Sequence, residues 1–119
     1  MNPINNETIN TILDLADGDS DILLDLSKSF LNDTKELLDG IKYSVINLNW
    51  EKLEFNVHTL KGLSATIGAV PLFEVCKQLN EDLKKGEIKK AISLVNSLNV
   101  KYIEVVDYIK SNYQVEDET

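Results

Sequence analysis

The chain has 119 residues, 43% of them hydrophobic, and a formal net charge of −8, and all of its twelve basic residues are lysine. This length predicts one domain with a single core, and the acidic balance without arginine argues against nucleic acid or an anionic membrane surface as a partner. The chain lacks an apolar run of the roughly 20 residues that span a membrane, its first residues do not resemble a signal peptide, and its single cysteine cannot form an internal disulfide, so we expect a cytoplasmic protein.

Apolar residues recur at helical spacing along almost the whole chain, and no alternating strand pattern is present. The pattern predicts a short first helix over residues 7–16 and a second over 20–30. A third helix is expected to begin at a cap formed by Asn32 or Asp33. It contains Gly40, and because an interior glycine costs about 1 kcal/mol relative to alanine, this residue weakens the helix.

The next helix is predicted to run from about Trp50 to Ile67, with Gly68 as its C-terminal cap. Two further helices follow, one from about Pro71 to Gly86 and one over residues 88–109. The helix that begins at Trp50 shows one continuous core face, which consists of Trp50, Leu53, Val57, Leu60, Ser64 and Ile67. Short turns make sequential helices antiparallel, so we expect an all-α, up-down-up-down four-helix bundle whose one or two short N-terminal helices cap one end.

His58 is the only histidine, so the chain has one place for imidazole chemistry near neutral pH. At 100° per residue, His58 lies roughly 120° from the mean direction of the core face, which predicts an exposed side chain. Residues three and four positions away share its helix face, and here they are a cation, Lys61, and a glycine, Gly62. Three more residues on the histidine's side are candidate partner contacts: Glu54, Phe55 and Ala65.

Each of these features has an ordinary explanation when it is taken alone. A single surface histidine is usually just solvated, and an exposed apolar residue such as Phe55 is normal on any surface. An exposed mid-helix glycine, however, costs about 1 kcal/mol. The close approach of another molecule to this position would explain why it is a glycine.

The run His58-Thr59-Leu60-Lys61-Gly62, followed by Ile67-Gly68-Ala69, resembles the signature of histidine-containing phosphotransfer (HPt) domains. The resemblance extends from about Ile9 to Ile109, and we interpret residues 1–119 as one HPt domain with a flexible acidic tail over 114–119. It implies that His58 accepts a phosphoryl group from a receiver-domain aspartate of a hybrid sensor kinase and passes it to a response-regulator aspartate. It also implies that Lys61 stabilises the phosphoryl oxygens and that Gly62 leaves room for the receiver.

Some positions depart from the family pattern. Val57 stands where alanine is common, Leu63 where a small or polar residue is common, and Asn49 where aspartate is usual. None of these changes removes a phosphotransfer group, but they bear on the choice of partner.

The chain contains no glycine-rich phosphate loop, so we expect a phosphocarrier without kinase activity of its own. No cofactor is expected, and the magnesium ion that assists transfer is expected on the receiver. One histidine and one cysteine at unrelated spacing do not predict a metal site, and Cys76 falls on a core face, which predicts a packing role.

Two alternatives remain open at this stage. The first is a phosphodonor domain of a chemotaxis-type histidine kinase, which shares a similar histidine-lysine-glycine pattern. The second is a module that docks a receiver and never carries phosphate. No apolar stripe is left over that would demand a dimer, so we expect a monomer.

Overall fold

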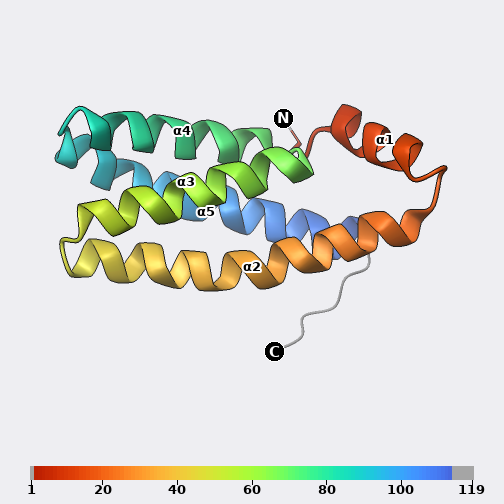
Figure 1. The fold of residues 1–119 in the computed structure, drawn as a ribbon, viewed down its shortest axis with the longest axis horizontal. Helices are drawn as coiled ribbons and strands as arrows, with labels where there is room; N and C mark the ends of the chain where they lie inside the picture. The colour runs from red at the N-terminus through yellow and green to blue at the C-terminus, as the bar shows by residue number, and fades with distance from the viewer. Residues whose placement is uncertain (1, 114–119) are drawn as a thin grey trace.

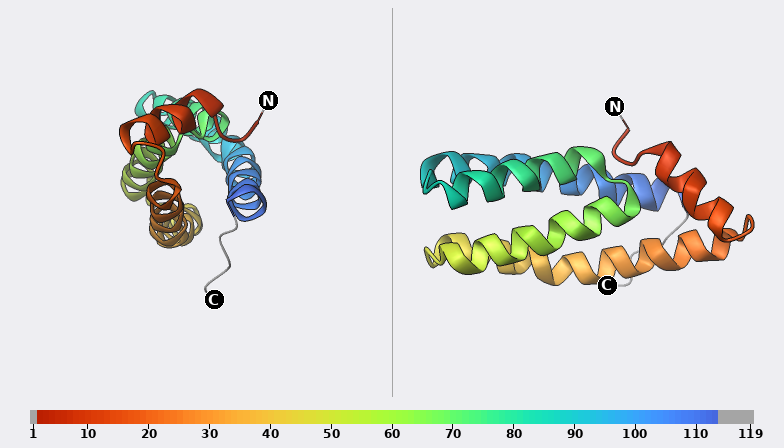
Figure 2. Two further views of the ribbon diagram at one scale, coloured as in Figure 1. Left: turned by 90° about the vertical axis from the view of Figure 1, so that its right-hand side faces the viewer. Right: turned by 45° about the horizontal axis from the view of Figure 1, so that its top comes forward.

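The computed structural model describes residues 2–113, and the regular structure in them is entirely helical. Four helices run antiparallel to their neighbours in sequence and form a bundle, and a short helix lies across one end of it (Figures 1 and 2). This confirms the predicted four-helix bundle with a leading helix. The tail predicted at 114–119 lies outside the described residues. In chain order the helices are α1 (Asn6–Leu15), α2 (Ser20–Ile46), α3 (Trp50–Ile67), α4 (Val70–Lys84) and α5 (Ile88–Asn112).

The break predicted near Asn32 or Asp33 was wrong, because α2 is one continuous helix. Both of these side chains are exposed, whereas Phe30 and Thr34 are buried in the same stretch. The Thr34 hydroxyl donates to the Phe30 carbonyl oxygen at 2.7 Å and lies 2.9 Å from the hydroxyl oxygen of Tyr102 on α5. The buried face of α2 therefore continues from Phe30 to Thr34, past the exposed Asn32 and Asp33. Asparagine and aspartate have only modest helix propensities, and tertiary packing overrides them here.

The N-terminal segment is fixed to the turn between α3 and α4. Gly68 ends α3 as predicted, in the left-handed conformation with φ of 78°. Its carbonyl oxygen accepts a hydrogen bond from the Asn5 backbone N–H at 2.8 Å, and Ile4 is fully buried. A Cβ atom at position 68 would lie 2.6 Å from the Cβ of Thr8. Both its backbone conformation and the close approach of α1 therefore require glycine at this position.

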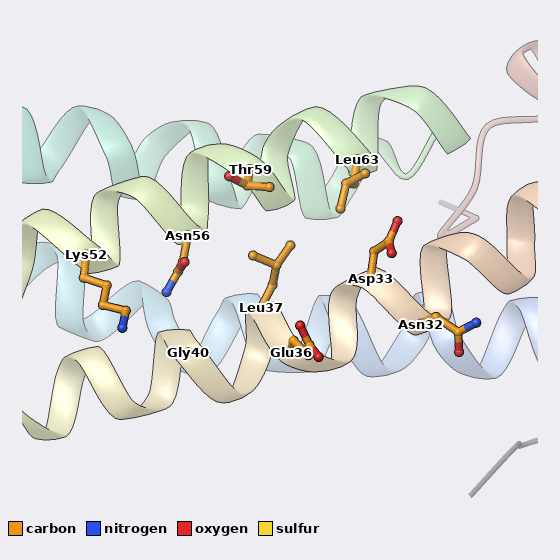
Figure 3. A pocket seen from close by; sticks show the side chains of 9 residues that line it. All are labelled: Asn32, Asp33, Glu36, Leu37, Gly40, Lys52, Asn56, Thr59 and Leu63. Carbon is orange, nitrogen blue, oxygen red and sulfur yellow. The ribbon is translucent and has the colours of Figure 1, made fainter.

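The two helices α2 and α3 approach each other closely at Gly40. A Cβ atom on Gly40 would lie 2.7 Å from the side-chain nitrogen of Asn56. Asn56 is buried, and Figure 3 shows its amide pointing from α3 toward the Gly40 backbone. The glycine that weakens α2 as an isolated helix therefore makes room for a buried side chain of its neighbour.

This contact predicts a non-additive effect of two substitutions. Gly40→Ala should raise the free energy of unfolding by less than the roughly 1 kcal/mol that helix propensity predicts, because the new Cβ atom displaces the Asn56 amide. In an Asn56→Ala background the same change should give the full gain. Urea unfolding of the two single variants and the double variant measures this, and additive effects would contradict the contact.

Candidate functional site

The buried face of α3 determines where His58 points. Leu53, Val57 and Leu60 are fully buried, and α3 packs between α2 and α4. His58 lies on the opposite side of the helix and is exposed, as the periodicity predicts. Among residues 2–113, no group forms a hydrogen bond or an ion pair with the imidazole. Both ring nitrogens are therefore open to solvent and to another molecule.

Lys61 lies on the α4 side of the histidine, and its side chain is half-buried. Burial raises the pKa of the Cys76 thiol on α4 to about 12, and the positive charge of Lys61 lowers it in part. The ammonium group is thus close enough to α4 for the sulfur to sense its charge. This agrees with a lysine whose stem lies along apolar surface while its head remains at the surface.

Gly62 has open space where its side chain would be. A Cβ atom at this position would meet nothing within 4 Å, in contrast to Gly40 on α2. The φ angle of Gly62 is helical, so its backbone does not require glycine either. Neither the packing nor the backbone of the described residues therefore accounts for this glycine, which lies one turn from His58.

The three predicted contact residues are all found near His58 on α3. Phe55 is 68% exposed, Ala65 is exposed and Glu54 is half-buried. The Phe55 carbonyl oxygen also accepts a hydrogen bond from the Thr59 hydroxyl at 3.0 Å, within the same stretch of helix. A large apolar ring and a glycine thus flank an exposed imidazole on one helix face.

A groove of about 720 Å³ runs between α2 and α3, beside the histidine's face. Figure 3 shows Leu37 of α2 pointing into it, with Thr59 and Leu63 on the α3 side. Asp33 and Glu36 line it from α2, and the periodicity of α3 alone did not reveal them. The sequence could have indicated them through α2, because these two acidic residues are three positions apart and share one side of that helix.

The described residues contain no group of three or more histidine, cysteine, aspartate or glutamate side chains that could hold a metal ion. Within the same residues, no helix is both long and apolar enough to cross a membrane.

The family model of the Hpt domain matches residues 25–112 of the chain. A comparison with curated proteins found no match. Among solved structures, the chain is similar to histidine-containing phosphotransfer protein B (HptB) from Pseudomonas aeruginosa PAO1, with a TM-score of 0.85 and 23% sequence identity over 97% of each chain. This likeness confirms the fold across nearly the whole length, including α1.

The buried Cys76 predicts a loss of stability in alkali. Its thiol has a pKa near 9 when the chain is unfolded and about 12 when folded, so the unfolded chain releases this proton first as the pH rises. The free energy of unfolding of the wild type, measured in urea from about pH 7 to about pH 11, should therefore fall more steeply above about pH 9 than that of Cys76→Ala. Parallel curves for the two proteins would contradict this role of burial.

Proposed function

Since this chain belongs to the Hpt domain family and is a histidine phosphotransfer protein of a phosphorelay, we propose that His58 is the residue that carries the phosphoryl group. The observation that supports this most directly is the exposure of its imidazole, which has no partner among residues 2–113. The chain has no second histidine that could take its place. A nucleophile that must meet a phosphoryl group on another protein needs this accessibility.

The transfer step exchanges one bond to phosphorus for another. The lone pair of one neutral imidazole nitrogen forms the N–P bond while the P–O bond to the aspartyl carboxylate of the receiver breaks, and the carboxylate leaves with the bonding electrons. The second ring nitrogen keeps its proton. No general base is needed, because a neutral imidazole already offers a lone pair. The reverse step passes the phosphoryl group to the aspartate of the next receiver.

Phosphoryl transfer depends mainly on positioning and on stabilising the charge of the equatorial oxygens. Lys61 is a half-buried cation one helical turn from His58, and it lies close enough to α4 for its charge to act on the Cys76 thiol. We assign it the stabilisation of these oxygens. Magnesium and the other catalytic groups would come from the receiver, so the chain acts as a carrier without kinase activity or a cofactor of its own.

The partners that fit this role are a hybrid sensor histidine kinase and the receiver domains of response regulators. Phe55, Glu54 and Ala65 surround His58 and would contact the receiver, and Gly62 would leave the space into which the receiver moves. We propose that the protein works as a monomer in the cytoplasm.

The role of His58 is tested by the transfer of a labelled phosphoryl group from a receiver domain to the chain. Purified chain is mixed with a phosphorylated receiver domain and magnesium, and uptake is measured for the wild type and for His58→Gln. Uptake should be acid-labile, stable in alkali and absent from the variant, whose helix content should match the wild type by circular dichroism. Uptake that persists in His58→Gln would refute the assignment.

Gly62 allows stability and function to be separated. Because a Cβ atom there meets nothing within 4 Å, Gly62→Ala should raise the free energy of unfolding by about 1 kcal/mol. The same change, and more strongly Gly62→Leu, should slow phosphoryl transfer because the side chain occupies the space of the receiver. Ser97→Leu, at an exposed position of α5, is the matched control and should transfer at the wild-type rate. Equal rates for Gly62→Leu and this control would remove the role given to Gly62.

A further inference from the structure

The bundle is loosely packed along one side, between α2 and α5. In the left view of Figure 2, α2 and α5 stand apart, while α3 and α4 lie against their neighbours. Both α2 and α5 pack far less against each other than against the helices on their other sides. The hydroxyl groups of Thr34 and Tyr102 meet at 2.9 Å and connect the two helices at one point. We therefore expect apolar residues along this side of α2 to keep part of their surface exposed.

A seven-residue repeat runs along this side of α2. Its first row is apolar and half-buried, and it consists of Leu24, Leu31, Leu38 and Val45. Its second row is basic and exposed, and it consists of Lys28, Lys35 and Lys42. At 100° per residue, the apolar row lies roughly 160° from the α2 residues that line the groove to α3, so it borders α5. An apolar row with a charged row beside it at this spacing is typical of a helix that packs against another helix.

α5 borders the same side with an apolar row of its own. Val95 and Val106 are half-buried and lie seven residues before and four residues after Tyr102, so they share its side of α5. Ile92 and Ile103 each lie three residues before one of these valines, and they are 40% and 56% exposed. We call this row and the two rows of α2 the α2–α5 seam. An apolar surface placed on the seam would remove these side chains from water.

The length of the seam fits a helix from another protein. From Leu24 to Val45 it measures about 32 Å at 1.5 Å per residue. Residues 114–119 of the chain would span at most about 22 Å when fully extended, and Val115 is the one apolar residue among them. A second copy is a poorer fit, because a two-fold dimer brings the same lysine-bearing surface of both copies together.

The charges of the seam favour an acidic helix. Lys28 and Lys42 are exposed, and neither forms an ion pair or a hydrogen bond with another of residues 2–113. At 100° per residue, the nearest acidic residues of α2, Asp21 and Asp39, lie beyond the lysines, on the side away from the apolar row. The edge of the seam on α2 is therefore positive, although the whole chain has a net charge of −8.

We propose that the α2–α5 seam binds an acidic amphipathic helix of a partner protein. The apolar face of that helix packs on the apolar rows of α2 and α5, and its aspartate or glutamate side chains pair with Lys28 and Lys42. Burial of the apolar rows provides the affinity, and the opposite charges determine which helix is accepted. Because α3 does not border the seam, this helix and a receiver at His58 can bind at the same time. The inference goes beyond the proposed phosphotransfer function and does not depend on it.

Two fluorescent synthetic peptides of about 21 residues test the charge preference. Both have leucine at the first and fourth positions of each heptad, and beside these the acidic peptide has glutamate where the basic peptide has lysine. In fluorescence anisotropy at low salt, the full-length wild type should bind the acidic peptide about tenfold more tightly than the basic peptide. The double variant Lys28→Glu/Lys42→Glu should reverse this preference. Lys77→Glu/Lys84→Glu, at exposed positions of α4, changes the net charge equally and should keep it.

A second pair of variants tests the apolar contact. Ile103→Ser should weaken binding of the acidic peptide about fivefold, because the isoleucine loses the surface that the peptide buries. Val100→Ser is the matched control, since Val100 is 53% exposed on α5 but lies roughly 160° from Tyr102 around the helix. It should bind like the wild type. Circular dichroism of both variants should show the helix content of the wild type.

Amide chemical shifts in NMR spectra locate the bound peptide. Addition of the acidic peptide should shift amides of α2 and α5, and uptake of the labelled phosphoryl group at His58 should continue when the peptide is saturating. Equal binding of the two peptides by the wild type, binding of neither, or shifts centred on His58 would each overturn the proposal. Uptake that does not depend on His58 would refute the proposed function alone.

The same measurements distinguish two other occupants of the seam. Dimers of the wild type in light scattering that Ile103→Ser abolishes would assign the seam to a second copy of the chain. If the wild type binds neither peptide but Glu116→Gln/Asp117→Asn/Glu118→Gln binds the acidic one, the C-terminal residues of the chain are the occupant. Either result would overturn the proposal.

Discussion

The packing of α3 between α2 and α4 is the constraint on which the site depends. Leu53, Val57 and Leu60 are fully buried, so α3 cannot rotate about its axis without exposing them. Burial of one such side chain contributes roughly 1.5–3 kcal/mol, and the three together hold the helix in one orientation. His58 faces away from the core for this reason. The exposure of the imidazole is therefore a consequence of the hydrophobic core and needs no interaction of its own.

Two glycines in the middle of helices have opposite explanations. Gly40 lies where α2 and α3 touch, and the amide of Asn56 occupies the space that a side chain at position 40 would take. Gly62 lies on the outer side of α3, and its missing side chain leaves open space. Each lowers helix propensity by about the same amount. In the first case packing within the molecule offsets the loss. In the second case no contact among the described residues offsets it, which agrees with the role proposed for Gly62.

The proposed site combines an exposed imidazole, His58, and one nearby cation, Lys61. In the proposed function these two groups form one half of a reaction centre, and the receiver supplies the other half. Recognition of that partner must then come from a surface larger than the histidine. The groove between α2 and α3, which Asp33, Glu36 and Leu37 line from α2, lies beside His58 and enlarges the surface around it.

The sequence by itself determined the helical class, the boundaries of α3 to α5 within a few residues and the outward direction of His58. These follow from local quantities, namely the period of the apolar residues, the polar residues at helix starts and the left-handed glycine at position 68. The signature around His58 also sufficed to predict the family. Local periodicity is enough for these features because each depends on one helix.

Only the tertiary structure decided the rest. Asn32 and Asp33 have the chemistry of a helix start, but α2 continues through them because Phe30 and Thr34 are held in the core by other helices. The reason for Gly40 lies in Asn56, sixteen positions away on α3, and the groove beside His58 exists only where α2 and α3 meet. Contacts between residues distant in sequence carry no local pattern, so their energies appear only once the helices are packed.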